Sequence, residues 1–258
     1  MSVFSVVRGQ SDNTLLENIN FNDTSLIDTE ALKTVIAEYI DSSLDRTKTA
    51  KEQMYDMILA TDNVLAHAST GFEMYRFVYQ YLIGGFSTLG ANMVVDYMVR
   101  LPYFEFVEAD EIQRLEMQNI AESYKRVKIG AEAPVIQAVT LEGKAFDLTD
   151  VESEYVLVFF WSPSCPHCHE MLKELAKYAN KREGITVVTV SVGTDLKEVR
   201  KMLAKSRLKG YHICDGDGWN SLLVDDYAVD VTPSLFLLKD KRILAKPFDI
   251  KELITIIE

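Results

Sequence analysis

Two cysteines, Cys165 and Cys168, are the residues of this chain best suited to chemistry. Their Cys-x-x-Cys spacing lets the two sulfurs reach each other across one helical turn, so the pair can open and close a disulfide. The apolar run 156–160 directly before them predicts a buried strand, and the residues after Cys168 have helical spacing. A strand leading into a helix places the first sulfur at the positive end of the helix dipole, which favours thiolate over thiol. This is the minimum requirement for thiol–disulfide exchange.

The segments after the cysteines predict an α/β sheet. The β-branched run 185–192, bounded by Gly184 and Gly193, is typical of a buried parallel strand. Further along, the pattern predicts a helix over 195–206, strands over 234–238 and 243–245, and a last helix capped by Asp249. Strand–helix–strand–helix followed by two adjacent strands and a helix implies a central mixed sheet with helices on both faces.

Several motifs in this half resemble proteins of the thioredoxin fold, most closely the TlpA/ResA-type branch of the bacterial envelope. They are residues 161–168 (WSPSCPHC), 231–233 (VTP), 130–134 (GAEAP) and 141–144 (LEGK). The resemblance covers roughly residues 128–258 and implies an α/β thioredoxin-like domain. The combination of motifs is specific, whereas Cys-x-x-Cys alone would be a weak signal.

The resemblance assigns roles to four residues. It implies that Cys165 is the attacking cysteine, that Cys168 is the resolving one, and that Pro233 is a cis-proline facing the pair. A cis X-Pro bond is uncommon, so one is usually kept for a reason. Here it would present the Thr232 backbone to an incoming peptide strand.

Three further residues are expected to support the pair. Trp161 lies beside it in sequence and is expected to pack against the site, while Pro166 presets the first helical turn. His167 can donate to the Cys165 sulfur or add positive charge nearby, which predicts a thiol pKa below the ordinary value. Pro-His also occurs between the cysteines of strongly oxidising thioredoxin-fold proteins, so we expect a reduction potential above thioredoxin's value of about −270 mV.

Three positions depart from the family pattern. Phe159 stands where thioredoxins carry a buried acid, Met171 stands where the TlpA/ResA-type branch often has a glutamate, and Lys173 stands where a helix-kinking proline is usual. These departures leave the proton acceptor of Cys168 open. The candidates are His167, His169, Glu170 and water.

The cysteine pair also allows other interpretations. Ligand chemistry for zinc is present in Cys165, His167, Cys168 and His169. Residues 165–169 also match the Cys-x-x-Cys-His pattern of haem attachment. The metal reading leaves the strand–helix frame and Pro233 unexplained, and in the thioredoxin frame His169 lies inside the helix, which makes the haem match accidental. A peroxiredoxin would need a proline at Val158. We therefore expect no cofactor and no metal, and we interpret Cys214 as a small core residue at a strand end.

The region before residue 128 is different in kind, with no cysteine and almost no strand signal. Apolar residues recur at helical spacing in five segments: 30–40, 54–65, 74–82 (ending at Gly84-Gly85), 94–101 (ending at Pro102) and 112–127 (opened by Asp110). We predict an all-helical domain over 1–127, followed by the thioredoxin-like domain over 128–258. We expect the helical domain to shape access to the cysteines rather than to add chemistry.

Length and charge narrow the classes of partner. The 258 residues fit two domains, and the net charge of −12 argues against nucleic acid. No apolar run approaches the length of a membrane span, and residues 1–7 lack the basic start of a signal peptide. The family resemblance favours the periplasm or cell envelope over the cytoplasm. It also favours a removed leader, through which the protein could be tethered to a membrane.

Two functions of different classes follow. The leading hypothesis is a thiol–disulfide oxidoreductase that exchanges disulfides with protein substrates and with an upstream redox partner. The alternative is a non-catalytic binding module that uses the helical domain and carries a structural or vestigial cysteine pair.

Overall fold

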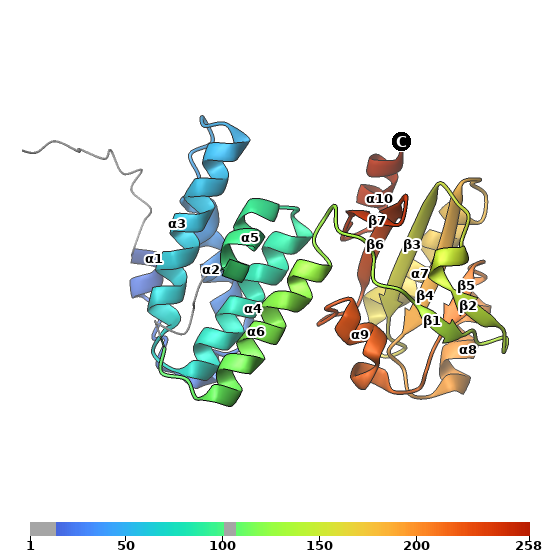
Figure 1. Cartoon of the computed structure of the whole chain (residues 1–258), viewed down its shortest axis with the longest axis horizontal. Helices are drawn as coiled ribbons and strands as arrows, with labels where there is room; N and C mark the ends of the chain where they lie inside the picture. The colour runs from blue at the N-terminus through green and yellow to red at the C-terminus, as the bar shows by residue number, and fades with distance from the viewer. Residues whose placement is uncertain (1–13, 101–106) are drawn as a thin grey trace, which may run out of the picture. The chain divides into compact units, whose positions relative to one another are not determined.

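The computed structural model describes residues 14–100 and 107–258 (Figure 1). The chain divides into two compact units. The described residues up to Phe86 and within Ala91–Glu122 make the helical unit. Ser87–Gly90 and Ser123–Glu258 make the second unit, called the redox unit only for the cysteine pair that it contains. Because this division falls inside the helix Glu111–Arg126, the predicted boundary after residue 127 stays a prediction. Residues 1–7 and Pro102 lie outside the described residues.

The described secondary structure of the first unit is all helical, as the apolar spacing predicts. Its helices are α1 (Thr14–Glu17), α2 (Glu30–Ser42), α3 (Ala50–Ala68), α4 (Phe72–Thr88), α5 (Asn92–Arg100) and α6 (Glu111–Arg126), with a 3₁₀ turn, η1 (Thr24–Leu26). Side-chain caps set two of the starts. The Thr29 hydroxyl accepts the Leu32 N–H at 3.3 Å, and Asp110 accepts the Gln113 N–H at 2.9 Å.

The end of α4 differs from the sequence prediction. The helix does not end at Gly84-Gly85 but continues to Thr88. A glycine inside a helix costs only about 1 kcal/mol, and the next residue, Phe86, buries its ring. The stop is Gly90, whose φ of +69° is the left-handed conformation typical of a helix end; the Ala91 N–H then donates to Phe86 O at 2.9 Å.

Two tyrosines of the helical unit form hydrogen bonds to neighbouring helices. The Tyr79 hydroxyl donates to Met98 O at 3.3 Å, and the Tyr97 hydroxyl donates to Asp62 at 2.6 Å. Burial, together with the bond to Asp62, raises the pKa of Tyr97 to about 12. These bonds connect α3, α4 and α5, so the tyrosines here hold helices together.

The redox unit contains two sheets. A small antiparallel one pairs β1 (Gln137–Val139) with β2 (Ala145–Asp147), and the central one has the order β5-β4-β3-β6-β7. Its strands and helices are β3 (Tyr155–Trp161), α7 (Pro166–Ala179), β4 (Ile185–Ser191), α8 (Leu196–Ser206), β5 (Tyr211–Ile213), α9 (Leu222–Asp226), β6 (Ser234–Lys239), β7 (Arg242–Ala245) and α10 (Ile250–Ile257). β3 pairs parallel with β4 and antiparallel with β6, which confirms the mixed sheet.

Strand β3 is the centre of the redox unit because both its faces are buried. Alternate residues point to opposite sides of a strand. Leu157, Phe159 and Trp161 belong to a core that α7, α8 and α10 complete. Val156, Val158 and Phe160 belong to a second core that includes Val224 of α9. Helices therefore cover both faces of the sheet, as predicted.

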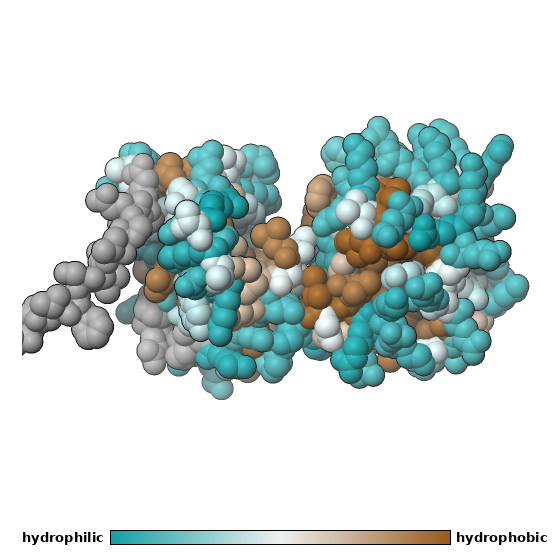
Figure 2. All heavy atoms as spheres, turned by 90° about the horizontal axis from the view of Figure 1, so that it is seen from above, coloured by the Kyte–Doolittle hydropathy of each residue, from teal (hydrophilic) through white to brown (hydrophobic). Residues whose placement is uncertain are grey.

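The face of the molecule drawn in Figure 2 is mostly polar. Hydrophilic side chains cover most of the face seen in Figure 2, with hydrophobic ones gathered over part of it. No helix in the described part of the chain combines the length and the apolar character that crossing a bilayer requires.

Candidate functional site

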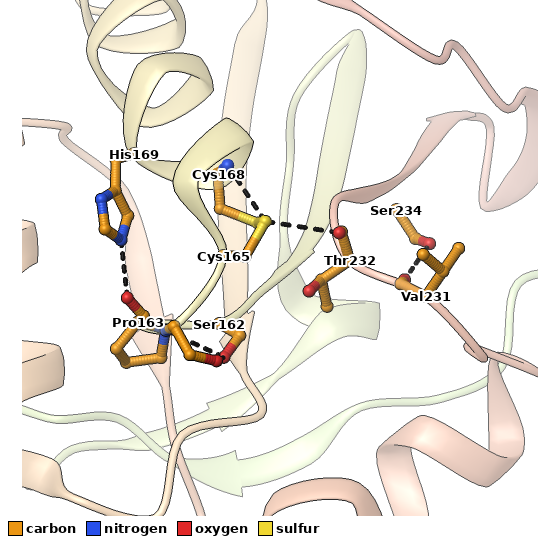
Figure 3. Close-up of a disulfide and its surroundings, with 9 residues drawn as sticks. Ser162, Pro163, Cys165, Cys168, His169, Val231, Thr232 and Ser234 are labelled. Carbon is orange, nitrogen blue, oxygen red and sulfur yellow. Dashed lines mark hydrogen bonds between the residues drawn. A yellow bond between two sulfur atoms is a disulfide. The ribbon is translucent and has the colours of Figure 1, made fainter.

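The two cysteines meet where β3 leads into α7. Cys165 and Cys168 are joined by a disulfide, with their Cα atoms 5.3 Å apart (Figure 3). Cys165 has an extended backbone and is the N-cap of α7, and Pro166 occupies the first turn. Proline suits that position because its missing N–H has no partner to lose there. The buried strand and the proline thus set the pair at a helix start.

Backbone groups surround the Cys165 sulfur. The Cys168 N–H donates to Cys165 Sγ at 3.2 Å, the bond that an N-cap side chain makes. In the reduced protein this bond and the helix dipole both favour the thiolate. On the other side, Cys165 Sγ lies 3.3 Å from Thr232 O, and Thr232 precedes Pro233 through a cis peptide bond. One predicted supporting residue, Thr232, therefore lies at the sulfur, and Pro233 follows it directly in the chain.

The two sulfurs differ in access. Cys165 is half-buried, whereas Cys168 is 0% exposed and belongs to an apolar cluster with Phe159, Trp161 and Met171. A substrate from solution can therefore reach only the first cysteine. Trp161 packs in this core as expected, although its indole N–H has no hydrogen-bond partner among the described residues.

The proposed proton acceptors for Cys168 are placed differently from one another. His167 and Glu170 are exposed. His169 turns its ring the other way, with Nε2 2.6 Å from Pro163 O (Figure 3). The predicted supporting residue His167 has no hydrogen bond in the structure that would tie it to the sulfur.

The turn before Cys165 was not identified from the sequence. The Cys165 N–H donates to Ser162 O at 3.1 Å, and the Ser164 N–H donates to Ser162 Oγ at 3.2 Å. The two serine hydroxyls lie 2.8 Å apart. Ser-Pro-Ser is a turn-forming sequence, which is the signal that could have drawn attention to it.

This turn rests on the loop that follows β4. A Cβ on Gly193 would lie 2.8 Å from Pro163 Cδ, so only glycine fits there without a shift. The Cys214 thiol donates to Gly193 O at 3.0 Å, and burial raises its pKa. Cys214 directly follows β5 and packs in the core, in line with its interpretation as a core residue.

The zinc interpretation finds no matching geometry. In residues 14–100 and 107–258, no group of three or more His, Cys, Asp or Glu is placed to hold a metal ion. Cys165 and Cys168 bond to each other, and His169 contacts a backbone carbonyl.

Comparisons with known proteins agree with this geometry. The AhpC/TSA family matches residues 129–246. The thiol-disulfide oxidoreductase ResA of Bacillus cereus is 27% identical over 127 residues, which cover 47% of this chain and 70% of ResA. The soluble secreted antigen MPT53 of Mycobacterium tuberculosis is 27% identical over 81 residues, 31% of this chain. The matched part spans 47% of MPT53, about half its length.

A solved structure extends the likeness of fold to the whole chain. A thioredoxin-like protein from Bacteroides caccae has a TM-score of 0.60 at 15% identity, covering 100% of this chain and 96% of its own. At that identity the match concerns the fold alone. Residues 129–246 are thus similar to the AhpC/TSA family, and the mixed sheet with the cysteine pair at the start of α7 gives this region a thioredoxin-like fold.

Proposed function

We propose that the protein is a thiol–disulfide oxidoreductase that exchanges disulfides with protein substrates. The observation that carries the proposal is the asymmetry of the pair. Cys165 is partly accessible and accepts a backbone N–H at a helix start, while Cys168 lies one turn deeper and fully buried. One sulfur can thus attack a substrate, and the other can close the disulfide behind it.

The exchange proceeds in two steps. The Cys165 thiolate attacks one sulfur of a substrate disulfide, which breaks that bond, forms a mixed disulfide and releases one substrate thiolate. Cys168, after losing its proton, attacks Cys165 Sγ, which closes the Cys165–Cys168 disulfide and releases the second substrate thiolate. Two electrons pass from the cysteine pair to the substrate. A dithiol partner then donates two electrons to the Cys165–Cys168 disulfide and returns the pair to the reduced state. The same steps in reverse oxidise substrate dithiols.

Thr232 is proposed to receive the substrate chain. Its carbonyl oxygen lies against Cys165 Sγ, so an extended peptide beside it would bring a substrate cysteine to that sulfur. Pro233 follows directly and shapes the loop. Pro166 sets the helix start, and Trp161 packs behind the pair.

Turnover of an insulin-like disulfide substrate tests the proposal. The parent protein with a dithiol donor should reduce insulin well above background, and Cys165→Ser should abolish this while keeping a hydroxyl cap. Cys214→Ser is the matched control, because it removes a thiol of the same core outside the pair and should retain turnover. A parent rate at background would reject the proposal.

A binding module is the second candidate, because apolar Phe159 and Met171 surround Cys168 where an acid would assist proton loss. The insulin assay separates the two functions.

The reduction potential of the cysteine pair is proposed to be higher than that of thioredoxin, with His167 contributing. His167→Pro should therefore lower the potential measured against glutathione. MPT53 carries the word secreted in its name, and we propose the periplasm or cell envelope for this protein too.

The helical unit is proposed to modify substrate selectivity. The boundary between the two domains is proposed to lie near residue 127. Tyr124 donates to Asp230 at 2.9 Å and Val127 packs in the sheet core, so a redox fragment should begin at Ser123 rather than at Lys128. That fragment should keep its reactivity toward small disulfides and change its rate on protein partners. Loss of activity on small disulfides in a folded fragment would contradict this role.

A further inference from the structure

One side chain of α7 bonds back across the cysteine pair. The Nε2 atom of His169 lies 2.6 Å from the carbonyl oxygen of Pro163, six residues earlier (Figure 3). A carbonyl oxygen can only accept, so Nε2 must carry the hydrogen and donate it. The bond joins the residue after Cys168 to the turn before Cys165. It therefore encloses both cysteines in one short, closed segment.

The enclosed segment is held at both ends. On the turn side, Ser162 O accepts the Cys165 N–H at 3.1 Å, and Pro163 sits against Gly193, where no side chain could fit. On the helix side, His169 belongs to the second turn of α7, a helix of 14 residues whose apolar stripe is buried. The imidazole thus connects a packed turn to a packed helix.

The disulfide itself performs the same task only while it is closed. When the pair is reduced, the covalent link is gone, and the orientation of Cys165 depends on noncovalent contacts. The bond from the Cys168 N–H to Cys165 Sγ requires the turn to stay seated on the helix start. The Pro163–His169 bond is a side-chain hydrogen bond between this turn and the helix.

We propose that His169 is a positioning residue that holds the Ser162–Cys165 turn on the start of α7 in the reduced protein, and so sustains the Cys165 thiolate. This inference rests on the proposed redox function of the pair. It assigns His169 the role of a hydrogen-bond donor to Pro163 O rather than that of a base for Cys168. His167, the other histidine of this segment, is exposed and makes no such bond.

Alkylation of the reduced full-length protein tests the role without requiring turnover. In His169→Leu, which lacks a donor, the Cys165 thiolate midpoint should move upward, and alkylation at about pH 6 should slow by about threefold or more. His169→Gln should restore the parent rate, because its amide N–H can reach the same carbonyl. His67→Leu is the control, since it removes an equivalent contact of a histidine Nδ1 with a helix carbonyl, Asn63 O at 2.8 Å, in the helical unit.

Three outcomes decide the question. A raised midpoint in His169→Leu, with rescue in His169→Gln and no change in His67→Leu, supports the proposal. An unchanged midpoint in a folded His169→Leu protein overturns it, whatever the insulin assay gives. Should the leucine variant fail to fold, the imidazole carbon shifts of the parent decide it: a fixed Nε2–H tautomer supports the bond, and an Nδ1–H tautomer rejects it.

Discussion

Two strand–helix connections lie side by side in the redox unit and differ in the atom that caps the helix. β3 leads to α7 and β4 leads to α8, and because the two strands are parallel, both helices begin at the same edge of the sheet. At α8, the Asp195 carboxylate accepts the N–H groups of Lys197 and Glu198 at 2.8 and 3.3 Å. At α7, Cys165 Sγ accepts the Cys168 N–H.

The comparison separates what the fold provides from what the residue provides. Both helix starts offer unpaired N–H groups and the positive end of a dipole. A carboxylate at Asp195 uses them to stabilise the helix, and it has no further bond to make or break. A sulfur at Cys165 can use the same groups to stabilise a thiolate, which in the proposed function leaves one partner and attacks another. The residue type therefore decides which of two similar sites can be reactive.

Replacing the Cys165 cap of α7 by an aspartate, the residue that caps α8, should change activity more than any other variant considered. In Cys165→Asp, a carboxylate takes over the capping bond, so the reduced protein should stay folded while insulin turnover falls by more than roughly a thousandfold. Thermal unfolding under reducing conditions and the turnover assay measure the two quantities. Residual turnover near the parent rate would mean that the exchange does not depend on Cys165.

The pH dependence of alkylation should separate the capping thiol from a buried one. In the reduced protein, Cys165 should titrate with a midpoint below that of an ordinary cysteine, because the helix start stabilises its thiolate. Cys214 should titrate above the ordinary value of about 8.5, because burial raises its pKa. Mass spectrometry of alkylated peptides distinguishes the two sites. Equal midpoints would show that the helix start does not stabilise the Cys165 thiolate.

Removing the second cap should affect stability alone. Asp195→Ala leaves two N–H groups of α8 without their acceptor and should lower the free energy of unfolding by about 1 kcal/mol, while Asp195→Ser should recover most of it. Urea unfolding measures the change, and insulin turnover should stay at the parent level. A loss of turnover in the alanine variant would show that the two helix starts are coupled.

The smallest effect on stability is expected from a buried histidine on β5, the strand next to β4. His212 is buried on β5, with Nδ1 2.9 Å from Thr189 Oγ1 of β4 and Nε2 3.1 Å from Leu208 O. Burial lowers its pKa below the ordinary 6.5. Below pH 6.5 the unfolded chain therefore binds a proton that the folded protein does not, so stability should fall as the solution is acidified.

A His212→Gln variant isolates the contribution of His212 protonation to the pH dependence of stability. It keeps an N–H for Leu208 O and has no titrating ring, so its unfolding free energy should depend less on pH between about 7 and 5 than that of the parent. Urea unfolding at each pH gives the comparison. Identical slopes in the two proteins would show that other groups account for the acid sensitivity.

The sequence by itself determined the features that depend on neighbours along the chain. Periodic apolar residues located the long helices and the strands β3, β4 and β6. Capping residues such as Thr29, Asp110 and Asp249 marked helix starts, because a cap bonds to backbone only two or three residues away. The position of the cysteine pair at a strand–helix junction belongs to the same class.

The tertiary structure alone decided the features that join distant or irregular segments. The short strands β1, β2 and β5 carry too few residues for a periodic signal, and long-range pairing such as the Leu141 N–H to His212 O, at 2.7 Å, holds them. The helix α4 passes its glycines because packing of Phe86 outweighs propensity. Thr232, 67 residues from Cys165, meets its sulfur only because β6 pairs with β3. The Pro163 turn bonds to His169 and also lies against Gly193, 30 residues further along, and the second contact has no local signature in the sequence.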